Sequence, residues 1–247
     1  MVILKSDKEI EAMAQAGRIA GLCLKFLGSL VRPGITTGEL DARAEEFIRS
    51  HGAIPTFKGY NGFPGSICTS INETVVHGIP DETLLREGDI ISIDVGATFL
   101  GFVGDTAATF AVGRVSREAQ RLISCTEEAL AKGIAAAKEG GYLGDIGYAI
   151  ESHAAMFGYS VVRDYAGHGV GRKMHEDPCV SNFGVPGTGR RIRIGMVIAI
   201  EPMINAGTYE VITYPDMRVV TRDGSLSAHF EHTVAITPEG PRCLTLV

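Results

Sequence analysis

Four stretches of the chain combine apolar residues with the start and stop signals of helices. Ser6 and Glu9 have the spacing of a capping box, and the residues that follow are rich in Ala, Leu and Ile. Pro33 and Gly34 end this first pattern, because proline cannot continue a helix. The predicted helices span residues 7–30, 36–50, 116–138 and 145–157.

Between and after these helices the chain has apolar runs typical of strands. A strong buried strand is predicted at residues 90–95 and a return strand at 101–112. Glycines and prolines between residues 55 and 80 indicate short strands and turns, and strands dominate from residue 160 onward. No linker, low-complexity tract or charge run divides the sequence. We therefore expect an α+β fold in which residues 1–247 form a single domain.

A weak internal repeat relates the first half of the sequence to the second. The segment Gly88–Asp94 matches Gly195–Glu201, 107 residues later, and each has a glycine, an apolar strand and a carboxylate in the same place. A second match, 106 residues apart, relates two glycines and a glutamate of an early helix to those of a later one: Gly38, Glu45 and Gly52 to Gly144, Glu151 and Gly158. These matches predict two related α/β halves, with chance agreement of short apolar strings as the alternative. If the halves are related, Asp94 and Glu201 end equivalent strands and face each other across a pseudo-twofold axis.

Composition and charge exclude several functional classes. The net charge is −6 and no block of Lys and Arg is present, which argues against nucleic-acid binding. No apolar run reaches the ~18 residues of a membrane span, and the first residues lack a signal-peptide pattern, so we expect a cytoplasmic protein without membrane contact. The five cysteines are odd in number and scattered, which argues against a disulfide framework and a structural zinc site.

Four carboxylates stand in unusually apolar or uncharged surroundings: Asp94, Asp105, Glu201 and Glu231. A lone buried carboxylate costs several kcal/mol unless it is paired or neutralised, and no Lys or Arg lies nearby in sequence. Two divalent cations would balance the four negative charges. Each residue alone is better explained as a cap or turn residue, so the prediction of a dinuclear metal site rests on the whole set.

His168 adds an imidazole to these carboxylates. It lies in a run of small residues, Gly167 to Gly171, which lets the backbone approach a neighbour closely. Carboxylates with a single histidine suit Mn, Fe, Co or Zn, whereas a structural zinc site would be rich in cysteine. A histidine in such a run is more often an ordinary loop residue, so His168 too is a candidate only as part of the set.

Taken together, the motifs resemble those of the type I methionine aminopeptidases, a branch of the pita-bread metallopeptidases. The resemblance covers essentially the whole chain and includes an 11-residue spacing from Asp94 to Asp105. The matching segments are residues 70–73, 76–80, 88–96, 167–171, 175–178, 200–202 and 227–233.

The resemblance implies a pita-bread fold, with two pseudo-symmetric α/β halves and a curved antiparallel sheet covered by helices. It also implies two divalent metal ions (Co, Mn, Fe or Zn), one bound by Asp94 and the other by His168 and Glu201. Asp105 and Glu231 would bridge the two ions.

For catalysis, the resemblance implies that His77 and His175 contact the substrate and that Glu201 acts as general base. The residues around the methionine pocket would be Tyr60, Phe63, Cys68 and Met174. Ordinary core packing explains these four equally well. Met174 and Met217 stand where many relatives carry aromatic residues, so the shape of the pocket is expected to differ.

The implied activity is metal-dependent removal of the initiator methionine from nascent proteins whose second residue is small, by attack of a metal-activated water on the peptide bond. The substrates would be N-termini of nascent polypeptides, reached through transient contact with the ribosome, and relatives suggest a monomer.

Two other functions remain open. A Xaa-Pro aminopeptidase or dipeptidase of the same fold usually carries a separate N-terminal domain, whereas here the catalytic-type pattern begins within the first few residues. A non-enzymatic pita-bread binding protein would have lost metal ligands, and this chain keeps all five.

Spacing in the sequence also separates the two types of methionine aminopeptidase. A type II enzyme would carry an insertion between His168 and Glu201, which are only 33 positions apart here.

Overall fold

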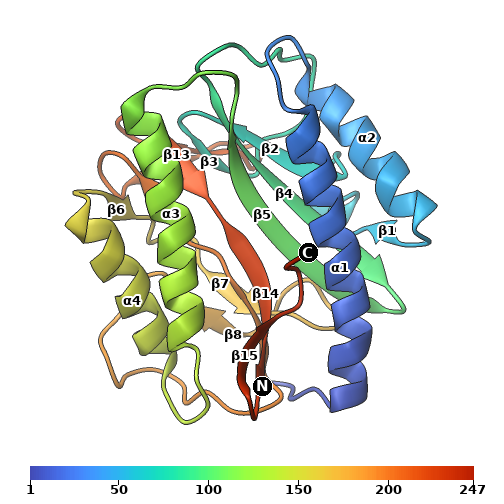
Figure 1. Cartoon of the computed structure of the whole chain (residues 1–247), viewed down its shortest axis with the longest axis vertical. Helices are drawn as coiled ribbons and strands as arrows, with labels where there is room; N and C mark the ends of the chain where they lie inside the picture. The colour runs from blue at the N-terminus through green and yellow to red at the C-terminus, as the bar shows by residue number, and fades with distance from the viewer.

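The computed structural model describes all 247 residues, and four long helices lie against a large β-sheet (Figure 1). The helices are α1 (Asp7–Leu30), α2 (Thr37–Ser50), α3 (Arg117–Ala136) and α4 (Leu143–Met156), with a 3₁₀ turn η1 (Tyr60–Gly62). The strands are β1 (Ile54–Pro55), β2 (Ile67–Ile71), β3 (Thr74–Val76), β4 (Ile90–Phe99), β5 (Phe102–Ala111), β6 (Ser160–Val161), β7 (Gly167–Gly169), β8 (Glu176–Val180), β9 (Val197–Ile200), β10 (Met203–Asn205), β11 (Val211–Thr213), β12 (Val219–Thr221), β13 (Ser227–His229), β14 (Glu231–Thr237) and β15 (Gly240–Cys243).

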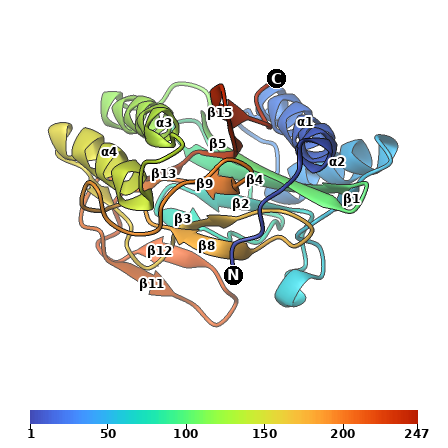
Figure 2. The ribbon, with the colours of Figure 1, turned by 90° about the horizontal axis from the view of Figure 1, so that it is seen from below.

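The largest sheet has nine antiparallel strands and provides the frame of the molecule. Its main path runs β1-β4-β5-β14-β9-β7-β8, while β2 pairs with β4 and β15 with β14. All four helices cover one side of this sheet, and the β11–β12 hairpin lies on the opposite side (Figure 2). The predicted curved antiparallel sheet with a helical cover is therefore confirmed.

The helix start signals act as the sequence predicts in the first half. The Ser6 amide donates to Glu9 Oε2 at 3.0 Å, and Thr36 Oγ1 accepts from the Glu39 amide at 3.0 Å. In the second half, α4 begins two residues before the predicted Asp145. The reason is that Asp145 occupies the first turn and accepts from the Tyr142 amide at 2.7 Å, rather than preceding the helix.

The β4–β5 hairpin is longer than the sequence predicts. Strand β4 continues for ten residues, because its second half stays paired with β5 up to a two-residue turn at Leu100 and Gly101. Both turn residues have positive φ, 51° and 75°, as the tight turn of a twisted hairpin requires. Asp94 therefore lies in the middle of β4, and the expectation that it ends a strand is wrong. Glu201 does follow directly after β9.

The internal repeat is confirmed at the level of whole elements. Helices α2 and α4 have the same length, and their bounds differ by 106 residues. An isolated β-bridge precedes each of them, joining Thr36 to Leu84 in one half and Tyr142 to Arg191 in the other. In the first half, the residue before α2 thus pairs with a residue just ahead of β4. In the second half, the residue before α4 pairs with a residue just ahead of β9.

Each half also has its own apolar core. One cluster of buried side chains packs α1 and α2 against β4, and the largest cluster packs α3 and α4 against β9 and β14. Between α1 and β5 the backbones touch, since a Cβ placed on Gly104 would lie 2.4 Å from Gly17 Cα. No helix is both long and apolar enough to cross a membrane.

Candidate active site

Five neighbouring strands each bring one side chain that can bind a metal ion to the same face of the sheet. Asp94 of β4 and Glu231 of β14 both pair with Ala107, which lies between them on β5. Asp105 is two residues before Ala107, so its side chain points to the same face. The next strands add Glu201 at the end of β9 and His168 within β7. The order of the strands, not proximity in sequence, assembles the cluster.

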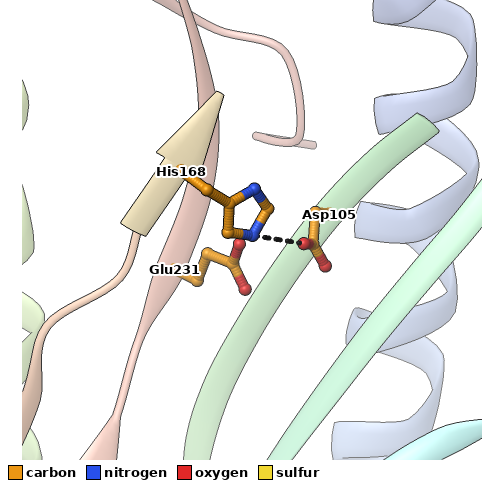
Figure 3. Close-up of side chains that lie close together, drawn as sticks. All are labelled: Asp105, His168 and Glu231. Carbon is orange, nitrogen blue, oxygen red and sulfur yellow. Dashed lines mark ion pairs between the residues drawn. The ribbon is translucent and has the colours of Figure 1, made fainter. Parts of the chain in front are cut away.

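The side chains converge closely enough to share a cation. Asp105, His168 and Glu231 each offer a donor atom within 4.8 Å of the other two, and Figure 3 shows them pointing toward one another from three strands. His168 Nε2 lies 3.7 Å from Asp105 Oδ2 and 3.5 Å from Glu201 Oε1. Asp94 stands diagonally across from Asp105 on the adjacent strand.

Burial makes this cluster electrostatically unfavourable without a counter-charge. It raises the pKa of Asp94, Asp105, Glu201 and Glu231, and that of Asp105 reaches about 7. Repulsion by neighbouring carboxylates raises the pKa of Asp94, Glu201 and Glu231 further. Burial also lowers the pKa of His168 to about 4, so that this imidazole is neutral at pH 7. No Lys or Arg lines the cavity to compensate.

The donor atoms fit divalent cations well. Asp94 Oδ1, Asp105 Oδ1 and Glu231 Oε1 are buried and have no hydrogen-bond partner in the protein. Orphaned buried oxygens of this kind are costly unless a ligand satisfies them. Carboxylate oxygens beside a neutral imidazole form the donor set expected for first-row divalent metals.

The cluster forms one wall of a cavity of ≈ 300 Å³, and every residue that the sequence singled out lines it. Phe63, Cys68 and Met174 are buried and form an apolar part of the wall, while Tyr60 is 38% exposed at the mouth. The full lining is Phe57, Tyr60, Asn61, Phe63, Cys68, Val76, His77, Asp94, Asp105, Tyr165, Ala166, His168, Met174, His175, Glu201, Met203, Met217, His229 and Glu231. An apolar pocket and a polar cluster therefore share one space.

The two histidines predicted to contact substrate reach this cavity from separate loops. The His175 ring lies 4.1 Å from that of His168, centroid to centroid, and its Nδ1 is 2.9 Å from the Tyr60 hydroxyl. The His77 ring meets Tyr165 edge-on at 5.7 Å. Burial lowers the pKa of both His77 and His175, so both are neutral at pH 7. His77 has a φ of 61°, an uncommon conformation for a residue with a side chain.

His229 is a cavity residue that the sequence reasoning did not single out. It is 2% exposed, its Nε2 lacks a hydrogen-bond partner, and that atom lies 3.8 Å from Glu201 Oε2. Burial lowers its pKa to about 3. The signal available in the sequence was its position two residues before Glu231, although the two lie in separate short strands.

Comparison with known proteins agrees with this geometry. The model of metallopeptidase family M24 matches residues 11–238. A methionine aminopeptidase of Clostridium acetobutylicum is 55% identical, over 100% of this chain and 99% of its own length. The crystal structure of methionine aminopeptidase from Rickettsia prowazekii superposes with a TM-score of 0.98 at 46% identity, covering 100% of both chains. A Xaa-Pro dipeptidase from Bacillus anthracis shares the fold, with a TM-score of 0.78, but at 23% identity and with 61% of its length covered.

Proposed function

This chain belongs to metallopeptidase family M24, and from that premise we propose that it removes the N-terminal methionine from newly made polypeptides. The observation that carries the proposal is a single cavity in which a buried carboxylate–imidazole cluster faces an apolar wall of Phe63, Cys68 and Met174. Such a wall suits an unbranched thioether side chain, since methionine sulfur is soft and polarizable. The full-length similarity to methionine aminopeptidases supports the same substrate.

We propose that the cluster holds two divalent ions, with Co, Mn, Fe and Zn as candidates. Asp94 would bind one ion, His168 and Glu201 the other, and Asp105 and Glu231 would bridge them. Four carboxylates, of which Asp105 and Glu231 are buried and Asp94 and Glu201 partly buried, share the cavity with no cationic side chain, which supports a site that accepts more than one positive charge. When bound, such ions lower the pKa of a coordinated water and polarise the scissile carbonyl.

The protein's own groups then position the substrate and move protons. Glu201 accepts the proton of the attacking water as general base. The Tyr60 hydroxyl and His175 Nδ1 lie 2.9 Å apart. With the hydroxyl as donor, the proton of the neutral imidazole is on Nε2, where it would donate a hydrogen bond to the carbonyl oxygen as negative charge develops. His77 holds the peptide backbone near the bond to be cut.

The biological setting follows from the substrate. Nascent chains present their initiator methionine in the cytoplasm, where we place the protein, and transient contact with the ribosome through the domain surface would bring substrate and enzyme together. Because both halves supply metal ligands, we propose that residues 1–247 act as one catalytic domain. We further propose a monomer, since a single chain provides every residue of the site.

The proposal is tested by release of free methionine from Met-Ala-Ser and Met-Val peptides, with added Mn or Co and again with a chelator. We expect release that requires metal, while a Xaa-Pro peptide stays intact. Cleavage of the Xaa-Pro peptide alone would move the assignment to the proline-specific enzymes of this fold. Absence of turnover with every metal would instead favour a binding protein.

A further inference from the structure

A buried ion pair, Lys5–Glu176, lies next to His175 in the fold and outside the residues that line the cavity. Lys5 Nζ is 2.6 Å from Glu176 Oε2, and the two side chains are only 4% and 8% exposed. In every other ion pair of a Lys or Arg, both side chains are at least 25% exposed. Lys5 belongs to the segment ahead of α1, whereas Glu176 follows His175 immediately.

The Glu176 carboxylate lies inside the turn between β7 and β8 and contacts the backbone of that turn. Its Oε1 accepts from the Lys173 amide at 3.3 Å and fills the space beside Gly171, where an added Cβ would be 2.3 Å away. The Glu176 backbone pairs with Gly169, the residue after His168. The carboxylate therefore defines the shape of the turn that carries His175.

Lys5 is equally well fixed at its own end. Its amide donates to the Gly195 carbonyl at 2.7 Å, and its ammonium also donates to the Ile3 carbonyl at 3.0 Å. Gly195 approaches so closely that a Cβ there would lie 2.9 Å from the Lys5 carbonyl oxygen. The ammonium is thus an anchor held by backbone contacts, not a mobile surface charge.

We infer that Lys5 is a positioning residue that acts through Glu176 on His175. Glu176 is the residue directly after His175, so fixing the Glu176 side chain inside the turn restrains the backbone that carries His175 and the direction in which its ring enters the cavity. This orientation determines whether the ring keeps its 2.9 Å contact with Tyr60 and presents its other nitrogen to the substrate. The inference rests on the proposed aminopeptidase function.

The cost of burying charge supports a role beyond stability. An isolated buried ion pair adds little net stability compared with an apolar pair of the same volume, although losing one partner is strongly destabilising. What the pair provides here is a directional, charge-assisted bond between two segments that are 171 residues apart in sequence.

The test compares kcat and KM for methionine release by the metal-loaded protein and four variants. Lys5→Met removes the anchor, Lys5→Arg keeps the charge, and Lys5→Met/Glu176→Gln removes both charges and so avoids an unpaired buried ion. Glu11→Gln breaks the exposed Glu11–Arg242 pair as a matched control. Thermal unfolding and the imidazole NMR signal of His175, assigned with His175→Gln, are recorded for each protein.

We expect Lys5→Met to lower kcat about tenfold to a hundredfold with KM changed less than about twofold, and to broaden the His175 signal. Lys5→Arg should restore most of kcat, and Glu11→Gln should match the wild type. The double variant should recover thermal stability but not kcat. Two results would show that the pair is only a structural contact. One is recovery of both kcat and thermal stability in the double variant, and the other is an unchanged His175 signal in Lys5→Met. Failure of the proposed function would show differently, as absence of methionine release by the wild type itself.

Discussion

At the scale of single residues, the site depends on side chains whose chemistry conflicts with their surroundings. Asp105 and Glu231 are each 2% exposed, yet each keeps one oxygen without a partner. Such oxygens were recognisable in the sequence, because acids inside apolar strands are rare and costly. His229 had one signal in the sequence, its position two residues before Glu231, whereas Lys5 had none, since its neighbourhood becomes unusual only when the chain folds around it.

His77 offers a test that separates metal binding from catalysis. His77→Ala should leave metal content unchanged, because no proposed ligand is removed, while kcat falls about 10²-fold or more from loss of a positioned contact to the substrate. Metal analysis of the purified variant and steady-state kinetics on a Met-Ala-Ser peptide measure both quantities. Equal kcat in variant and wild type would remove His77 from the mechanism.

At the scale of elements, the sequence predicted the helices more accurately than the strands. The bounds of α1 and α2 agree closely with prediction, because caps, glycines and prolines mark them locally. The second half of β4 was missed because Gly96 and Ala97 carry little strand propensity and are held there by pairing with β5. Pairing partners lie outside the segment, so propensity cannot supply them.

The contact between α1 and β5 predicts a sharp effect of one methyl group. In Gly104→Ala the new Cβ would overlap the backbone of Gly17, so helix and strand must separate. We expect the free energy of unfolding to fall by about 1–3 kcal/mol, as in other overpacked cores.

Urea denaturation measures this effect, and Lys132→Ala on the exposed face of α3 serves as control, with a change within about 0.5 kcal/mol. Metal-dependent activity should fall as well in Gly104→Ala, because Asp105 is the next residue along the strand. A Gly104→Ala protein as stable as the control would show that α1 can shift without cost.

At the scale of the whole molecule, the site lies where the two halves meet. Asp94 and Asp105 come from the first half of the repeat, and His168, Glu201 and Glu231 from the second. The repeat in the sequence therefore indicated the overall architecture correctly. It also led to the expectation that Asp94 and Glu201 face each other. That β5 and β14 lie between their two strands could not be derived from the sequence, because it depends on the order of strands in the sheet.

The buried carboxylates predict an unusual pH dependence for the metal-free protein. Burial raises the pKa of Asp105 from 3.8 to about 7, so between these values the folded state holds a proton that the unfolded state releases. The contribution of Asp105 to folding stability is therefore most favourable below about pH 4 and is lost as the pH rises through about 7.

Urea midpoints at pH 5 and pH 7.5 in chelator should show this loss, and Asp105→Asn should reduce it. Added Mn should reverse the trend, because the metal binds the deprotonated carboxylates and stabilises the folded state more at the higher pH. If the midpoints in chelator rise with pH to the same extent in wild type and Asp105→Asn, the carboxylate does not carry the raised pKa.

The position of β14 in the sheet has a consequence for how the protein is made. This strand lies between β5 and β9, yet a ribosome synthesises it after both of them. Until β14 inserts, β5 and β9 have no common neighbour, and the cluster lacks Glu231. A chain still under synthesis therefore lacks both a continuous sheet and the complete carboxylate–imidazole cluster. With Glu231 as a proposed ligand, we expect peptidase activity to begin only when this last central strand has been added, so that a growing chain does not act on the N-termini emerging around it.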